Sequence, residues 1–395
     1  MAALPEIFVV AATRTAIGSF GGALKDVPLS QLATTAVREA LRRSGADPAA
    51  VGHVVMGNVI PTDTRDAYLS RVAAIEAGIP KETPAFNVNR LCGSGLQAIV
   101  SAAQALRLGE AEIAIGAGAE SMSRGPYLMS AARWGGRMGD LQAVDYMLGI
   151  LHDPFHRIHM GVTAENIAAR DGITREMQDA LAAESHRRAA AAIAEGRFKE
   201  QIVPVEIKSR KGIVLFDTDE HVRADTTVEQ LAKMKPAFKN DGSVTAGNAS
   251  GLNDGAAAVV LASEAAVKSS NLRPMARLVS YAHAGVEPEL MGLGPIPATR
   301  LALQRAGLKA SQLDVIESNE AFAAQACAVT RTLELDPAKV NPNGSGISLG
   351  HPVGATGAVI TTKAIYELQR VGGRYALVTM CIGGGQGIAC IFERV

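Results

Sequence analysis

Short apolar runs alternate along the chain with longer segments in which hydrophobic residues recur at helical spacing. Runs such as residues 7–10 and 113–116 are uncharged and consist mainly of Val, Ile and Ala, which is typical of strands buried on both faces. The helical segments end at glycines suited to a left-handed terminal position, as at Gly45 and Gly307. This alternation predicts an α/β protein whose buried sheets are covered by helices.

The order of these segments occurs twice. The helix ending at Gly45 is followed by an apolar strand, and so is the helix ending at Gly307, 262 residues later. At this spacing Cys92 aligns with Gly354, each of them at the small-residue start of a long helix. A constant spacing between similar segments indicates an internal repeat. We therefore expect two repeated βαβαβ-type halves, stacked on each other as α/β layers.

The pattern changes after residue 122. Arg-, Met- and Gly-rich segments follow, and then an Ala-rich charged helix over residues 178–195 and a strand over residues 202–207. Because this stretch is too long for a plain loop, we interpret it as an inserted loop domain. The expected domains are an N-terminal half over 1–122 that is completed by about 253–272, the inserted domain over 123–252, and a C-terminal half over 273–395.

The charge balance excludes some classes of partner. Lys and Arg together number 39, as do Asp and Glu, so no overall basic field attracts nucleic acid or an anionic membrane surface. No apolar run approaches about 18 residues, the length needed to span a bilayer. Residues 1–10 also lack the basic and apolar regions of a signal peptide. We expect a protein that binds neither nucleic acid nor membrane.

The four cysteines form no CxxC pair, which argues against structural zinc and for a reducing compartment. We therefore expect a cytoplasmic protein. His152, His156 and His159 have helical spacing, but Pro154 intervenes and no acidic cluster completes a ligand set, so we predict no metal site. The glycine-rich stretch 383–387 departs from a dinucleotide-binding loop at its sixth position, which disfavours a redox cofactor.

Two of the cysteines occur where covalent acyl chemistry is possible. Cys92 lies at the junction between an apolar stretch and a helix, and a helix N-terminus lowers the pKa of a thiol. Cys381 lies just before three consecutive glycines, where a thiol can act as acid and base. Taken alone, a cysteine is more often a small buried hydrophobe. We interpret Cys327 and Cys390, in apolar surroundings, as such core residues.

His351, Asn319 and the backbone of Gly383 complete this candidate site. Each follows a strand or precedes a helix, the usual position of chemistry in α/β layers, so they can converge with Cys92. The imidazole can accept the thiol proton, the amide can orient a water or a carbonyl oxygen, and glycine N–H groups can stabilise an oxyanion. Taken singly, His351 and Asn319 are also explained as turn residues.

Four motifs in this order resemble those of the thiolase family, and the resemblance covers essentially the full chain. The motifs are NRLCGSG at 89–95, NEAFAAQ at 319–325, GHP at 350–352 and CIGGG at 381–385. The resemblance implies a thiolase-like fold and a reversible Claisen condensation, or thiolysis, of a 3-oxoacyl-CoA. No resident cofactor is implied, because acetyl-CoA, 3-oxoacyl-CoA and CoA are the substrates.

The resemblance also implies a role for each site residue. Cys92 becomes acylated, His351 activates it, and Cys381 exchanges the α-proton of the second acetyl unit. Asn319 holds a water that forms one oxyanion hole with His351, and the N–H groups of Cys92 and Gly383 form the other. Arg223 and Phe238 are implied to meet the nucleotide end of CoA. The other residues implied to contact the acyl-CoA are Ser250, Ala246, Leu252, His159, Met160, Phe322 and Met291.

We expect the substrates to be short 3-oxoacyl-CoA thioesters, C4 to about C6. Met160 and Met291 resemble the narrow pocket of short-chain biosynthetic thiolases, and residues 151–157 resemble bacterial β-ketothiolases that feed polyhydroxyalkanoate synthesis. A dedicated acetoacetyl-CoA thiolase and a catalytically silent CoA-thioester-binding subunit are alternatives, whereas Cys381 disfavours a ketoacyl synthase. Residues 124–138 resemble tetramer contacts, so we expect a homotetramer, a dimer of dimers.

Overall fold

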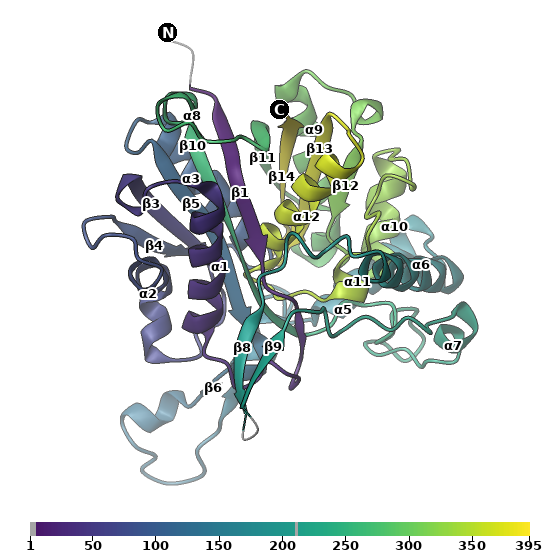
Figure 1. Cartoon of the computed structure of the whole chain (residues 1–395). Helices are drawn as coiled ribbons and strands as arrows, with labels where there is room; N and C mark the ends of the chain where they lie inside the picture. Colours follow the sequence, from purple (N-terminus) through teal and green to yellow (C-terminus); the bar gives the residue numbers. More distant parts are fainter. Residues whose placement is uncertain (1–4, 210–211) are drawn as a thin grey trace.

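The computed structural model describes residues 5–209 and 212–395 as layers of helices and strands (Figure 1). In these residues, a 10-stranded mixed sheet has the order β12-β13-β14-β11-β1-β10-β5-β3-β4, with β2 beside β10. The bounds are β1 Ile7–Arg14, β2 Gly18–Ser19, β3 Val51–Gly57, β4 Ala85–Val88, β5 Ile113–Ser121, β10 Asn253–Ser263, β11 Ala276–Gly285, β12 Val315–Ser318, β13 Tyr375–Ile382 and β14 Gln386–Arg394. Two small sheets pair β6 (Tyr127–Leu128) with β7 (Val144–Asp145) and β8 (Val205–Ser209) with β9 (Gly212–Phe216).

Helices lie between and around these strands. The α-helices are α1 Leu29–Ser44, α2 Leu69–Glu76, α3 Ser94–Arg107, α4 Tyr146–Ile150, α5 Met160–Asp171, α6 Arg175–Ala194, α7 Val228–Ala232, α8 Glu264–Ser269, α9 Pro295–Ala306, α10 Ala323–Thr332, α11 Gly346–Leu349 and α12 Thr356–Arg370. The 3₁₀ helices are Pro48–Ala50, Thr64–Tyr68, Met122–Arg124, Ser130–Arg133, Pro288–Leu293 and Ala310–Gln312. The prediction that no signal peptide occupies residues 1–10 falls partly on residues 1–4, which lie outside the described part.

The helices α3 and α12 lie between the two halves of the sheet, where they share one hydrophobic core with strands of both halves (Figure 1). The helices α1 and α2 cover the outer face of the N-terminal half. The helices α9 and α10 cover the outer face of the C-terminal half. The predicted α/β class is confirmed. The repeat is confirmed as well, since α3 begins at Ser94 and α12 at Thr356, 262 residues later.

The sheet combines parallel and antiparallel strand pairs. Parallel pairing, which a βαβ pattern predicts, joins β3 to β4 and β5, and also joins β12 to β13. In contrast, β13 and β14 are antiparallel neighbours connected by a tight turn. The turn is possible because Gly384 and Gly385 have φ values of 79° and 83°, which side chains other than glycine rarely allow. Cys381 therefore lies at the end of a buried strand, directly before the turn.

The contact between α3 and α12 is made by backbone against backbone. A Cβ on Gly95 would lie 2.7 Å from the backbone nitrogen of Ala358, and a Cβ on Gly357 would lie 2.1 Å from a backbone nitrogen of α3. Glycine is the residue that allows backbones to approach this closely. The starts of the two helices therefore lie side by side, which brings the segment of Cys92 next to the segment of His351.

The segment between β5 and β10 packs against the C-terminal half through α5 and α6, which contact α10. A buried ion pair between Arg14 and Asp219, 2.7 Å apart, connects this segment to β1. Its longest helix, α6, begins at Arg175, three residues before the predicted start, because Thr174 caps it. The Thr174 hydroxyl accepts the N–H of Met177 at 3.3 Å, a common way for a helix to begin.

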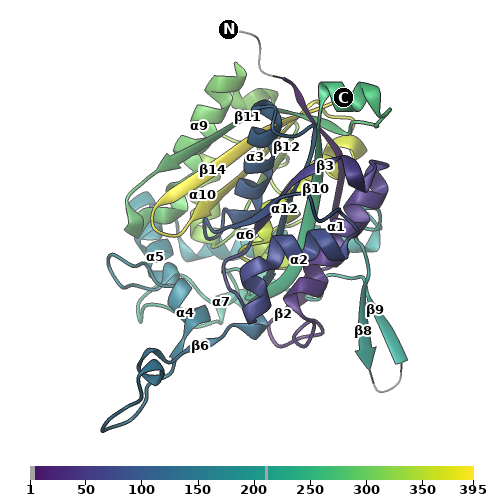
Figure 2. The ribbon, with the colours of Figure 1, turned by 90° about the vertical axis from the view of Figure 1, so that its left-hand side faces the viewer.

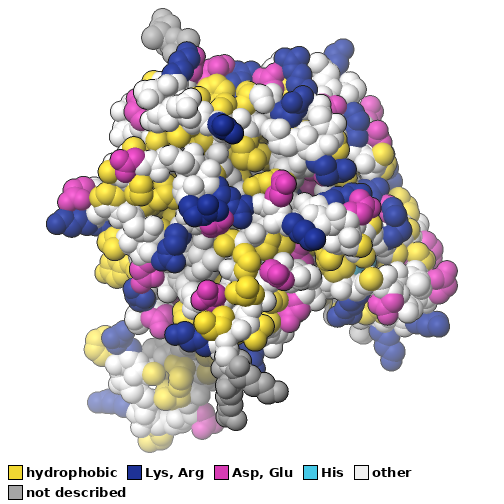
Figure 3. All heavy atoms as spheres, viewed as in Figure 1, with side chains coloured by type: hydrophobic (Ala, Val, Ile, Leu, Met, Phe, Trp, Pro, Cys, Tyr) yellow, Lys and Arg dark blue, Asp and Glu magenta, His cyan; other side chains and the backbone are white. Residues whose placement is uncertain are grey.

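Two projections leave the body of the molecule, the arm between β6 and β7 and the β8–β9 hairpin (Figure 2). The arm exposes Trp134 and Met138 at 90% and 97% of their surface. Elsewhere, Lys and Arg side chains are interspersed with Asp and Glu over the face shown in Figure 3. Among the described residues, no helix has both the length and the apolar character needed to cross a bilayer.

Gly357→Ala is expected to destabilise the fold strongly, because the added methyl group must displace the backbone of α3. Overpacking of a core costs about 1–3 kcal/mol, and we expect the free energy of unfolding in urea to fall by at least this amount. Gly149→Ala is the control, since a Cβ there meets no atom within 4 Å; because Gly149 lies in a helix, alanine should leave stability unchanged or raise it by up to about 1 kcal/mol. A Gly357→Ala protein as stable as this control would contradict the backbone contact.

Candidate active site

The connection from β4 to α3 holds Cys92 at the start of the helix. Leu91 has a φ of 44°, which is uncommon for a residue with a side chain, and its N–H donates to Asn89 Oδ1 at 2.9 Å. Ser94 Oγ accepts the N–H of Arg90 at 2.8 Å and donates to the Leu91 carbonyl at 2.6 Å. These hydrogen bonds stabilise the turn, and Cys92 faces a cavity beside the helix.

The cavity has a volume of about 360 Å³ and a mostly apolar wall. Most of the predicted site residues line it, namely Cys92, His351, Gly383, Ser250, His159, Met160, Ala246, Leu252, Phe238, Phe322 and Met291. Sequence reasoning missed the remaining lining residues, which are Leu91, Met122, Leu148, Ile150, Leu151, Ala237, Ala249, Gly251, Ala321 and Val353. Small and aliphatic residues carry no chemical signal in a sequence, so only the fold identifies these positions.

Asn319 and Cys381 lie behind the cavity wall. Both are fully buried, and Asn319 Nδ2 is 3.5 Å from His351 Nε2. Among the described residues, Asn319 Oδ1 has no hydrogen-bond partner. Burial, together with the nearby charge of Cys92, raises the pKa of the Cys381 thiol. The amide therefore adjoins the imidazole, and the second thiol adjoins the first.

Phe238 and Arg223, the two residues implied to meet the nucleotide end of CoA, lie apart in the structure: Phe238 lines the cavity and Arg223 does not. The Phe238 ring lies on the His159 ring, with centroids 4.6 Å apart and planes 15° apart, and Phe322 meets Phe238 edge-on at 6.1 Å. Arg223 is not part of the cavity wall; its backbone N–H donates to His186 Nδ1 at 3.1 Å. A contact between Arg223 and the nucleotide of CoA stays a prediction.

Hydrogen bonds orient the imidazole of His351. Its backbone N–H donates to Asn253 Oδ1 at 2.9 Å, and its Nδ1 lies 2.6 Å from Thr356 Oγ1. Because the Thr356 hydroxyl donates to the Pro352 carbonyl at 2.9 Å, Nδ1 carries the proton and Nε2 is left as an acceptor. The long helix expected to start near Gly354 begins at Thr356, so His351 belongs to the connection before it.

Burial determines the protonation states of Cys92 and His351. It raises the pKa of the Cys92 thiol to about 11, although the N–H groups of Gly383 and of Cys92 itself act in the opposite direction. The pKa predicted from the helix N-terminus is therefore wrong in direction, because loss of water outweighs the helix. Burial also lowers the pKa of His351 to about 4. The free protein thus holds a neutral thiol and a neutral imidazole on one cavity, and proton transfer from such a thiol to such a base can create a nucleophile.

A buried carboxylate joins the two halves beside the site. Glu120 accepts the N–H groups of Val59, Ile60 and Gly354 at 3.1, 3.0 and 2.8 Å, and the amide of Asn58 at 2.9 Å. Burial raises the pKa of Glu120 to about 8. Sequence reasoning missed this residue; an acidic side chain at the end of an otherwise apolar strand was the available signal. Its bond to Gly354 connects the segment after His351 to the N-terminal half.

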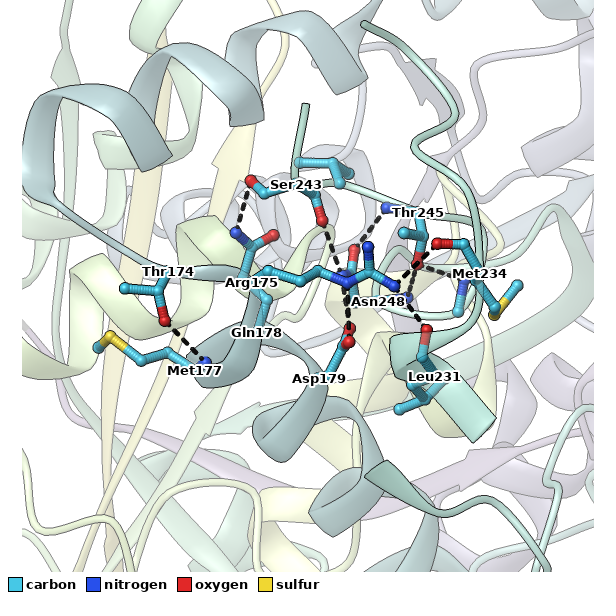
Figure 4. A network of polar contacts seen from close by, with 12 residues as sticks. Thr174, Arg175, Met177, Gln178, Asp179, Leu231, Met234, Ser243, Thr245 and Asn248 are labelled. Atoms are coloured by element: carbon cyan, nitrogen blue, oxygen red, sulfur yellow. Dashed lines mark hydrogen bonds and ion pairs between the residues drawn. The ribbon is translucent and has the colours of Figure 1, made fainter. Parts of the chain in front are cut away.

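The start of α6 positions the loop at residues 243–250, which contributes to the cavity wall (Figure 4). Asp179 accepts hydrogen bonds from Arg175 Nε at 2.7 Å and from Asn248 Nδ2 at 2.9 Å. Asn248 Oδ1 in turn accepts the N–H of Thr245 at 2.8 Å. Since Asp179 and Asn248 are both buried, these bonds give the loop one well-defined conformation.

The site thus contains a thiol, a neutral imidazole, a second thiol and backbone N–H groups that act on the first thiol. These are the parts needed to carry an acyl group as a thioester on cysteine and to stabilise the oxyanion that forms. Fold and site together define a cysteine-dependent acyltransferase.

Comparison with known proteins identifies the family. Residues 7–265 match the thiolase N-terminal domain and residues 272–394 match the thiolase C-terminal domain, so the chain belongs to the thiolase family. It is 67% identical to β-ketothiolase BktB of Cupriavidus necator over 391 residues, 99% of each chain. The Bacillus anthracis acetyl-CoA acetyltransferase superposes with a TM-score of 0.98 at 47% identity over 100% of both chains. Human mitochondrial 3-ketoacyl-CoA thiolase in complex with CoA superposes with a TM-score of 0.96 at 46% identity, over 99% of this chain and 98% of that chain.

These similarities confirm the predicted family, the thiolase-like fold and the activity of an acyltransferase of the β-ketothiolase type. The roles of individual residues, the acyl chain length and the assembly are not determined by them.

Alkylation of Cys92 by iodoacetamide should accelerate with pH throughout the neutral range. The pKa of the thiol is raised, so the thiolate is a minor species that increases about tenfold per pH unit. His351, whose pKa is lowered, stays neutral over the same range. We expect the logarithm of the rate to rise linearly between pH 6 and pH 8, measured by mass spectrometry of the Cys92 peptide. A level rate would indicate a preformed thiolate and contradict the neutral resting state.

Proposed function

We propose that this thiolase condenses acetyl-CoA with a short acyl-CoA and, in reverse, cleaves 3-oxoacyl-CoA of C4 to about C6 by thiolysis. The observation that carries this proposal is one apolar cavity onto which Cys92, His351 and Gly383 all open. A thioester suits such a site, since its carbonyl acidifies the α-proton and its thiolate is a good leaving group.

In the first half-reaction, Cys92 is the nucleophile. His351 Nε2 accepts the thiol proton, and the sulphur attacks the thioester carbonyl carbon. The bond to the CoA sulphur then breaks, and Cys381 gives its proton to the departing thiolate. The N–H groups of Cys92 and Gly383 stabilise the oxyanion. This role is supported by the Gly383 N–H, which donates toward the Cys92 sulphur.

In the second half-reaction, the Cys381 thiolate removes the α-proton of acetyl-CoA. The resulting enolate carbon attacks the acyl carbon on Cys92, so a C–C bond forms while the C–S bond breaks, and the Cys92 thiolate recovers its proton from His351. We assign to Asn319 a water that stabilises the enolate oxygen together with His351. The buried Asn319 Oδ1, which has no partner among the described residues, supports this assignment.

We assign CoA binding chiefly to the inserted segment, residues 123–252. Ser250 offers a hydrogen-bonding hydroxyl in an otherwise apolar wall, and the stacked rings of His159 and Phe238 form a flat surface for the pantetheine chain. The relative of known structure that contains CoA has the same fold, which supports a similar position of the ligand here. Arg223 lies outside the wall, so its proposed contact with the nucleotide requires a ligand that extends beyond the cavity.

A short acyl chain fits the inner end of the cavity. Met160 and Met291 are both buried there, with 7% and 3% of their surface exposed, and they limit its width. Methionine side chains can adapt to a ligand, which is compatible with chains somewhat longer than C4. The high identity to a β-ketothiolase supports the wider range over a dedicated acetoacetyl-CoA thiolase.

We also propose a homotetramer built as a dimer of dimers. The arm with the exposed Trp134 and Met138 offers one contact surface. The edge strand β4, on which Phe86 is 43% exposed, offers another.

The four cysteines are unpaired thiols, which suits a cytoplasmic location. Residues 151–157 resemble those of bacterial β-ketothiolases that feed polyhydroxyalkanoate synthesis, and this resemblance supports the same metabolic role here.

The two cysteines should separate the two half-reactions. Cys92→Ser is expected to abolish acyl-enzyme formation, because a serine hydroxyl is a much weaker nucleophile at this site. Cys381→Ser is expected to acquire labelled acetyl from acetyl-CoA more slowly, because water must then protonate the departing thiolate, but to form no acetoacetyl-CoA, since the base for the α-proton is missing. Mass spectrometry of the intact protein measures the first step. Absence of acetyl on Cys381→Ser would overturn this division of roles.

Thiolysis rates on two substrates test the proposed substrate range. Acetoacetyl-CoA and 3-oxohexanoyl-CoA are compared at equal CoA by loss of the magnesium-enolate absorbance. Thiolysis of both substrates is expected, with rates within about 200-fold of each other, because an extra methylene in an apolar pocket changes binding by about 1–3 kcal/mol. Activity on the C4 substrate alone would indicate a dedicated acetoacetyl-CoA thiolase, and activity on neither would indicate a silent binding subunit.

A further inference from the structure

A second cavity lies on the other side of the strand end that carries Asn319. It has a volume of about 480 Å³ and lies between α6, α10 and the segment 335–341. Its inner end is formed by Ser318 and Glu320, the two neighbours of Asn319 in the chain. None of its lining residues belongs to the wall of the cavity at Cys92. It is therefore a separate site that adjoins the catalytic centre.

The inner end of this second cavity carries a free hydroxyl. Ser318 is 2% exposed, and its Oγ has no hydrogen-bond partner among the described residues. A buried hydroxyl without a partner is costly. A ligand group that bonds to it would remove this cost, so the hydroxyl favours a polar group at this end.

A buried carboxylate lies beside the hydroxyl. Glu320 is 4% exposed and accepts hydrogen bonds from Asn341 Nδ2 at 2.9 Å and from Ser185 Oγ at 2.6 Å. In the described part of the chain it forms no ion pair, and Lys363, whose charge acts on it, is paired with Glu317 at 2.8 Å. Burial raises the pKa of Glu320. A cationic ligand would stabilise its charged form.

The rest of the wall holds aliphatic and charged side chains. Leu181, Leu335 and Val340 are among the aliphatic ones, and the charged ones are Glu184, Arg188, Arg331 and Glu334. The guanidinium of Arg188 bonds to Glu184 at 2.6 Å and to the Val340 carbonyl at 2.6 Å, so a carboxylate partner already balances its charge. The buried polar side chains of the wall are Ser318, Glu320 and the two that bond to Glu320, so a polar head group fits there and a short apolar body fits against the aliphatic residues.

We propose that this second cavity binds a small primary amine, with its ammonium group at Glu320 and Ser318 and a short alkyl chain against Leu181 and Val340. The ammonium donates to the Glu320 carboxylate and to Ser318 Oγ. Because these residues flank Asn319, the ligand also contacts the segment that holds the catalytic amide. The proposal does not depend on which acyl-CoA the enzyme uses.

Protection of Cys327 tests this proposal without reference to catalysis. Cys327 lines the cavity and is partly exposed, whereas Cys381 and Cys390 are buried. In a Cys92→Ser background, alkylation of Cys327 by N-ethylmaleimide is followed with n-butylamine, n-butanol or butyrate present. We expect saturable protection by butylammonium, weaker protection by butanol and none by butyrate. Equal protection by all three, or none by butylammonium, would overturn the proposal.

A pair of serine variants tests the position of the head group. Ser318→Ala removes the free hydroxyl and should weaken protection by butylammonium by about tenfold, the effect of one lost hydrogen bond. Ser345→Ala is the matched control, since Ser345 Oγ is also buried and unpartnered among the described residues but does not line this cavity. The control should retain full protection. Equal protection in both variants would place the amine elsewhere and overturn the assignment.

Discussion

The backbone contact between α3 and α12 is the constraint on which the rest of this molecule depends. Because Gly95 and Gly357 leave no room for a side chain, the starts of the two helices meet between the two halves of the sheet. The N-terminal half contributes Cys92, and the C-terminal half contributes His351 and Cys381. Neither half contains the full set of groups, so the site exists only where the two copies of the repeat pack together.

Burial then sets the electrostatics of the site. The same loss of water raises the pKa of Cys92 and lowers that of His351, which leaves the resting pair uncharged. In the proposed mechanism, charge develops only when the proton moves and a thioester is attacked. An apolar wall makes each N–H group near the sulphur more effective at that moment. The buried Glu120, bonded to Gly354, helps to keep this arrangement in place.

Most of the fold and most of the chemically distinctive residues that meet at the cavity could be predicted from the sequence, and the reasons differ between residues. Cys92 and His351 are chemically distinctive and lie in small-residue segments at helix starts. Leu148 and Ile150 line the same cavity, but aliphatic residues look alike in a sequence wherever they pack. The pKa of Cys92 is predicted in the wrong direction because a sequence reveals a helix start and not the extent of burial. The free hydroxyl of Ser318 likewise depends on contacts between distant segments.

The most direct test of the shared site is a crystal structure of the protein after brief exposure to acetyl-CoA. We predict an acetyl group on the Cys92 sulphur, with its carbonyl oxygen within hydrogen-bonding distance of the Gly383 N–H and the His351 imidazole beside the sulphur. This arrangement requires groups from both halves at one acyl carbon. An acetyl group on a different residue, or a carbonyl oxygen directed away from Gly383, would contradict it.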